Sequence, residues 1–134
     1  MPMPHKLILQ QLQQQGRIVE VQACEKLQRF EQEQQGLFCL QQREMGYLNT
    51  YDQLFRLITM WLLQQGYDLT NHQPHQVLKA VCRIHCPEQV IESVVQHRHE
   101  LKKGLITEVS KTAWHDLQQY HQYFMQILQA CNSR

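Results

Sequence analysis

The stretch of sequence that decides the fold is residues 107–130, TEVSKTAWHDLQQYHQYFMQILQA. Apolar side chains recur along it and just beyond it at intervals of three or four residues, at Val109, Ala113, Leu117, Tyr120, Phe124, Ile127 or Leu128, and Cys131. This 3.6-residue period places them on one face of a helix. Because so long an apolar seam is buried only against other helices, the stretch predicts a helical bundle.

Upstream segments show the same period and are separated by helix-breaking residues. Residues 51–65 form the strongest of these segments, with Asn49 or Thr50 as the expected N-cap. Pro74 is expected to open a further helix. The remaining predicted helices cover residues 7–15, which Gly16 stops, residues 21–35, which Gly36 interrupts, and residues 88–103, which Gly104 stops.

Neither a repeat nor a linker divides these segments. We therefore expect one all-α domain over residues 1–134, built as an up-and-down bundle of about five helices. Residues 1–20 would form a short helix and lead-in, and residues 21–131 the bundle. The 24 glutamines are interleaved with apolar residues, which favours solvent-facing helix surfaces over a disordered tract.

Charge and composition exclude several classes of protein. Lys and Arg number 13 against 12 Asp and Glu, so a generally basic nucleic-acid binder is excluded and such a role needs a local patch. No apolar run reaches the roughly 18–20 residues that span a bilayer, and the first residues do not resemble a signal peptide. The chain has five cysteines, an odd number that cannot all pair within one chain. We therefore expect a cytoplasmic protein with reduced thiols.

A cofactor or metal is not expected. The chain has no glycine-rich phosphate-binding loop of the common kinds. Cys82, His85 and Cys86 have a spacing that places them on one helical face, as metal ligands can be. Since no second cysteine pair accompanies them, we interpret them as core residues.

Arg98 interrupts an apolar face. In the helix predicted over residues 88–103, Ile91, Val94, Val95 and Leu101 define the buried stripe, and Arg98 falls in its middle. A guanidinium there is either paired with a buried carboxylate, such as Asp52 or Glu44, or presented to an anionic ligand in a groove, unless the assumed helix phase is wrong. The densest basic cluster surrounds it, HRHELKK at residues 97–103.

The order of these signals resembles the HEPN family of helical-bundle domains. Tyr51-Asp52 begins a helix that runs to Trp61 and Gly66-Tyr67, a loop bearing His72 and His75 follows, and a later helix carries Arg98 and a polar residue, His99. The earlier LQQQGRI, residues 12–18, is similar to the lead-in of some members.

The resemblance implies a four- or five-helix bundle that is usually a homodimer. In active members an Arg, and a His four to six residues later, line a cleft at the dimer interface and cleave RNA without a metal ion. Many members are toxins that pair with a small nucleotidyltransferase-like antitoxin. Others bind RNA or nucleotides without catalysis. Here Arg98 matches the family Arg and His99 the polar residue after it.

The family's closing His has no counterpart, because residues 102–104 are Lys102, Lys103 and Gly104. RNA cleavage without metal needs a proton acceptor and a proton donor, and an Arg is a poor proton shuttle. His99 is a substitute candidate, with His97, His72 and His75 as further candidates. We therefore expect an RNA or nucleotide phosphate to bind at a site made by Arg98, Lys102, Lys103, His72 and His75.

Two alternatives remain open at this point. One is a metal-independent endoribonuclease toxin with Arg98 and His99 as catalytic residues. The other is a protein-interaction module, for example a partner of a nucleotidyltransferase-like protein, in which Arg98 is a buried ion-pair residue. Phosphate binding weakens steeply with salt, whereas an apolar partner interface does not.

Overall fold

The computed structural model describes residues 4–21, 24–40 and 46–132, and it confirms the all-α fold class. Six helices and two very short strands make up the described chain. In order they are α1 (Pro4–Gln14), β1 (Ile18–Glu20), α2 (Cys24–Leu40), α3 (Tyr47–Gln64), β2 (Tyr67–Leu69), α4 (Pro74–His85), α5 (Ile91–Lys102) and α6 (Lys111–Asn132). None of the described helices is long and apolar enough to cross a membrane.

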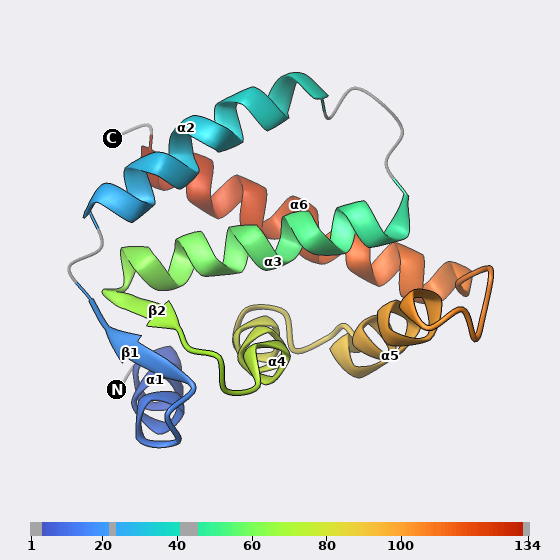
Figure 1. The fold of residues 1–134 in the computed structure, drawn as a ribbon, viewed down its shortest axis with the longest axis horizontal. Helices are drawn as coiled ribbons and strands as arrows, with labels where there is room; N and C mark the ends of the chain where they lie inside the picture. Colours follow the sequence, from blue (N-terminus) through green and yellow to red (C-terminus); the bar gives the residue numbers. More distant parts are fainter. Residues whose placement is uncertain (1–3, 22–23, 41–45, 133–134) are drawn as a thin grey trace.

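The core of the bundle lies between α3 and α6. These two helices lie side by side, with α2 above α3 and with α4 and α5 below it in the view of Figure 1. The predicted seam is confirmed on α6, since Ala113, Leu117, Tyr120 and Phe124 are fully buried. Of the two candidates at the next position, Leu128 is buried and Ile127 is only partly buried. Val109 is partly buried but precedes α6, and the side chain of Cys131 lies outside the described residues.

Helix α3 is the central element and is buried on most of its circumference. Eleven of its residues are buried, among them Tyr51, Leu54, Leu57, Ile58 and Leu62. A helix that is apolar nearly all round needs partners on several sides. Accordingly α2, α4, α5, α6 and β2 all contact α3, which therefore positions side chains of α4 and α5 relative to one another.

The structure contains a two-stranded antiparallel sheet that was not predicted from the sequence. It pairs β1, which follows α1, with β2, which follows α3. Ile18 pairs with Leu69 and Glu20 with Tyr67. The amide of Val21 also donates to the carbonyl of Gly66, whose positive φ of 92° turns the chain out of α3. Three-residue strands carry too short an alternation to be recognised in a sequence. In the folded chain, Ile18 of β1 is buried in the core.

Several predicted helix ends were wrong. Helix α3 begins at Tyr47 with Gly46 as N-cap, so neither Asn49 nor Thr50 caps it; the Thr50 hydroxyl instead donates to the Gly46 carbonyl at 3.0 Å. Helix α2 continues through Gly36, because one glycine inside a helix costs only about 1 kcal/mol relative to alanine. Helices α5 and α6 begin three and four residues later than expected, at Ile91 and Lys111.

Candidate functional site

Arg98 projects from α5 toward α3, and its position confirms the helix phase assumed from the sequence. Ile91 and Val94 of the same helix are fully buried, and Arg98 is half-buried beside them. Its guanidinium carbon lies 5.1 Å from the centre of the Tyr51 ring. A cation over an aromatic face at this distance is attracted by the ring quadrupole.

Arg98 forms no ion pair with the carboxylates of the described residues. The ion pairs found there join Lys26 to Asp68, Arg56 to Glu33, and Arg83 to Glu92. The Nε atom of Arg98 is buried and has no hydrogen-bond partner within the described ranges. The expected pairing with Asp52 is therefore absent, and the other suggested partner, Glu44, lies outside the described residues.

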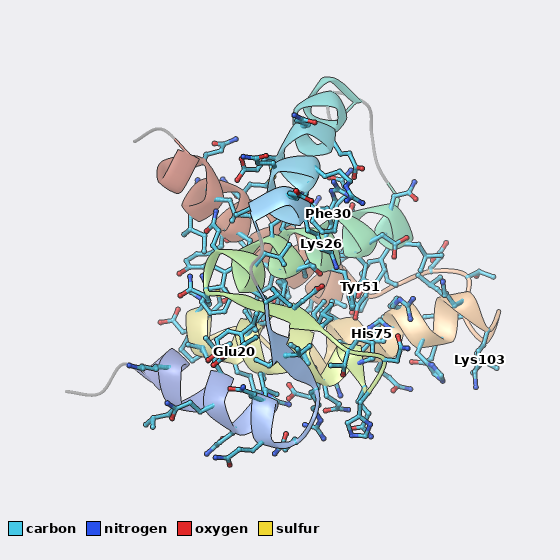
Figure 2. All side chains as sticks on the ribbon, turned by 60° about the vertical axis from the view of Figure 1, so that its left-hand side comes forward. Glu20, Lys26, Phe30, Tyr51, His75 and Lys103 are labelled. Atoms are coloured by element: carbon cyan, nitrogen blue, oxygen red, sulfur yellow. The ribbon has the colours of Figure 1, made fainter. Side chains whose placement is uncertain are left out.

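Tyr51 contacts both Arg98 and His75 and so brings them close together. The Tyr51 hydroxyl and His75 Nδ1 are hydrogen-bonded at 2.8 Å, with the donor set by the histidine tautomer. The Phe55 ring meets the His75 ring edge-on, with centroids 5.2 Å apart. Because Tyr51 and Phe55 are one turn apart on α3, a single helix face holds the imidazole at the start of α4. Figure 2 shows the side chains of Tyr51 and His75 adjacent to each other.

These side chains line one open cavity of about 370 Å³, formed by Tyr51, Asp52, Phe55, His75 and Arg98. Three helices supply the lining: α3 gives the two aromatic rings and the carboxylate, α4 the imidazole and α5 the guanidinium. Its size falls in the range of small-ligand sites in proteins.

Positive charge dominates the surroundings of His75. Burial is the main cause that lowers its pKa below the usual 6.5, and the charges of Arg98, Lys102 and Lys79 lower the pKa further. Among the described residues, only the carboxylate of Asp52 acts in the opposite direction. Three cations against one carboxylate give this cavity an unbalanced positive field, which suits an anionic ligand.

Burial also keeps the Tyr51 hydroxyl protonated. Its pKa is raised well above 10, mainly by burial, although the Arg98 charge partly offsets this shift. Tyr51 therefore acts as a neutral hydrogen-bonding group and not as a base.

The remaining residues of the predicted site are spread more widely. His72 is exposed in the loop before α4, where its amide donates to the Thr70 hydroxyl, and it does not line the cavity. His99 is exposed and does not line it either. Lys102 is exposed but close enough for its charge to act on His75. Lys103 lies at the far end of α5, away from Tyr51 and His75 in Figure 2.

The chain was compared with protein-family models, with curated proteins and with solved structures. None of these comparisons found a match. The resemblance to the HEPN family therefore stays a prediction that rests on the residues quoted for it.

Sequence reasoning missed the Tyr51 hydroxyl and Phe55 as site residues, because both were assigned to the apolar face of their helix. One signal was present: a tyrosine on a core-facing stripe usually has a partner for its hydroxyl when it is buried. That partner, His75, follows 24 residues later in the chain. Its identity depends on how α4 packs against α3, which the helical period does not specify.

Near the end of α4, Cys82 lies in the core, whereas His85 and Cys86 are partly buried. Cys82 is fully buried, and burial raises the pKa of its thiol. His85 is stacked edge-on against Trp61 and bonded to the Tyr123 hydroxyl at 2.9 Å. Over the described ranges, no group of three or more His, Cys, Asp or Glu side chains could hold a metal ion.

A second, larger hollow lies next to the first, one helical turn nearer the start of α3. Its volume is about 860 Å³, and its lining includes Tyr47, Leu101, Val109 and Trp114. The Tyr47 and Trp114 rings are tilted against each other at 5.7 Å. Among the described residues that line this hollow, none has a basic side chain, in contrast to the cavity at Arg98.

Proposed function

We propose that the chain binds a phosphate group, of RNA or of a nucleotide, in the cavity around Arg98. One observation carries this proposal: a half-buried guanidinium lines an open cavity without a carboxylate partner among the described residues. Withdrawing a charge from water is unfavourable unless a partner compensates it. A phosphate is a matching partner, since its oxygens accept two parallel hydrogen bonds from Arg.

The neighbouring charges support the same assignment. Arg98 and Lys102 stand one turn apart on α5, a like-charge pair that is unfavourable in the free protein. Both also disfavour protonation of His75. A bound anion would relieve this repulsion, so part of its binding free energy would come from charges that the fold already holds together.

The test is binding of single-stranded RNA and of 5′-AMP, followed as a function of salt. Arg98→Gln should weaken both by about tenfold or more, because a hydrogen bond between charged groups contributes roughly 1.5–3 kcal/mol. The matched control is Arg29→Gln, since Arg29 is exposed on α2 and does not line the cavity. Binding that is insensitive to salt, or equally weakened by both variants, would refute the proposal.

His75 favours a second candidate function, metal-independent RNA cleavage. Such a reaction needs a base that takes the 2′-hydroxyl proton, an acid that protonates the leaving 5′-oxygen, and a cation that stabilises the charged phosphorane. His75 and Arg98 line one cavity, whereas His99 does not. A lowered pKa keeps His75 neutral near pH 7 and able to accept a proton.

Cleavage of single-stranded RNA in excess chelator distinguishes the two candidates. If His75 acts on the reacting atoms, His75→Gln and Arg98→Gln should both abolish cleavage, while His99→Gln should leave it within about twofold. If His99→Gln alone abolishes cleavage, the role of His75 is wrong. If the unaltered protein binds RNA but does not cleave it, phosphate binding stands without catalysis.

A further inference from the structure

Asp52 lines the same cavity as Arg98, yet the two do not form an ion pair. The carboxylate is solvent-exposed, and its charge acts on both His75 and Tyr51. A site for phosphate alone gains nothing from a carboxylate, which repels the anion. A cavity that holds both charges apart suits a ligand with two different ends, one anionic and one that donates hydrogen bonds.

The balance of charge decides which kind of donor fits. Among the described residues whose charges act on His75, Arg98, Lys102 and Lys79 outnumber the carboxylate of Asp52, so an ammonium group would enter a field of its own sign. Neutral donors do not meet this penalty. A carboxylate accepts hydrogen bonds through both oxygens at once, which matches two neighbouring neutral donors on a ligand.

The aromatic lining of the cavity suits a ligand that carries an aromatic ring. Phe55 lines the cavity, is only half-buried, and has its ring edge-on to the His75 ring. Aromatic faces of this kind stack on nucleobases regardless of their sequence. A volume of about 370 Å³ is of the order of one small organic ligand and not of a folded partner.

We propose that the cavity takes a single nucleotide unit, with its phosphate on Arg98 and a pair of neutral donors on Asp52. Two parts of a nucleotide offer such a pair: the 2′,3′-diol of ribose and the Watson–Crick edge of guanine. Asp52 thereby selects what is attached to the phosphate, while Arg98 supplies the attraction common to all phosphates. This inference rests on the proposed function, and it identifies Asp52 as a specificity-determining residue.

Calorimetric titration with four ligands tests the assignment: sulfate, AMP, 2′,3′-dideoxy-AMP and GMP. The variants are Asp52→Asn and, as a matched control, Glu20→Gln, because Glu20 is exposed on β1, apart from Tyr51 and His75 in Figure 2. Asp52 is itself exposed, so its substitution should leave the fold intact, which circular dichroism checks. Arg98→Gln is included to report on the phosphate end.

If Asp52 accepts from the diol, AMP should bind about tenfold more tightly than the dideoxy analogue, and Asp52→Asn should abolish this ratio. If it accepts from guanine, GMP should bind about tenfold more tightly than AMP, and Asp52→Asn should abolish that ratio instead. In either case the affinity for sulfate should not fall in Asp52→Asn. Glu20→Gln should preserve every ratio.

Two results would overturn the inference. If Asp52→Asn tightens sulfate, AMP and GMP by the same factor, Asp52 only repels anions. If both ratios are near one in the unaltered protein, the cavity does not discriminate at this position. In both cases sulfate binding that is lost in Arg98→Gln would leave the proposed function standing, whereas absence of binding for all four ligands would remove both.

Discussion

A 2.8 Å hydrogen bond joins the Tyr51 hydroxyl to Nδ1 of His75. The guanidinium carbon of Arg98 lies over the ring of the same tyrosine, 5.1 Å from the ring centre. The same side chain thus holds the imidazole through its polar end and the guanidinium through its ring. Tyr51 is fully buried, so the packed core fixes the position of its ring.

Substitution of Tyr51 separates these two contacts. Tyr51→Phe removes only the hydrogen bond, so it should lower the free energy of unfolding by about 1 kcal/mol and leave sulfate affinity within about threefold. Tyr51→Leu also removes the ring beneath Arg98. Because that ring positions the guanidinium, sulfate affinity should fall further than in Tyr51→Phe. Urea unfolding and sulfate titration measure the two effects. Equal sulfate affinity in both variants would show that the ring does not position Arg98.

The lowered pKa of His75 makes stability depend on pH. The folded state disfavours protonated His75, and also protonated His121, whose pKa is lowered by burial. Below pH 6.5 the unfolded chain therefore binds more protons than the folded one, and the free energy of unfolding should fall as the pH decreases from 6.5 toward the lowered pKa values. Urea titrations at pH 7.5 and 5.0 should show this loss, and His75→Gln should reduce it.

Anion binding should show the opposite dependence on pH. A bound anion stabilises protonated His75, so its pKa rises on binding, and affinity should increase as the pH falls through the pKa of His75 in the complex. Sulfate is the suitable probe because its charge is constant over this range. An affinity independent of pH between 7.5 and 5.5, or a dependence that survives in His75→Gln, would contradict the placement of the anion beside His75.

A buried hydrogen bond connects α3 to α5: the Tyr47 hydroxyl donates to the Val94 carbonyl at 2.6 Å. Tyr47→Phe should lower the free energy of unfolding by about 1 kcal/mol, the usual contribution of one hydrogen bond. Tyr67→Phe is the control, because Tyr67 is only half-buried on β2. If both variants lose the same stability in urea, the Tyr47 contact contributes nothing specific.

The buried seam of α6 should contribute strongly to the stability of the bundle. Leu117 is fully buried between the helices, and Leu117→Ala should cost about 3 kcal/mol through lost burial and the cavity left behind. Leu105 is 68% exposed in the loop after α5, so Leu105→Ala should change stability by less than about 0.5 kcal/mol. A similar loss in both would mean that α6 does not pack as described.

Much of the fold could be predicted from periodicity and from glycine positions. The seam on α6 and the start of α4 at Pro74 are local properties, and they agree with the structure. Gly16 and Gly104, which were expected to end helices, both have positive φ. Helix starts were less predictable, because Gly46 caps α3 without a side chain and so carries no polar capping signal.

The candidate site was predictable only in part. The phase of α5 placed Arg98 on a buried face, since a helical period determines which side chains share a face. The period does not determine which residue of another helix lies opposite. His99, adjacent to Arg98 in sequence, points elsewhere, whereas His75, 23 positions away, lines the same cavity.

By itself, therefore, the sequence determined an all-helical chain, the buried seam of α6 and an arginine that does not match its apolar face. These follow from local spacing, which acts over one or two helical turns. Tertiary structure alone decided that Tyr51, His75, Asp52 and Arg98 meet in one cavity, and that β1 pairs with β2. The reason is that these contacts depend on how whole helices pack around α3, through burial summed over many residues far apart in the chain.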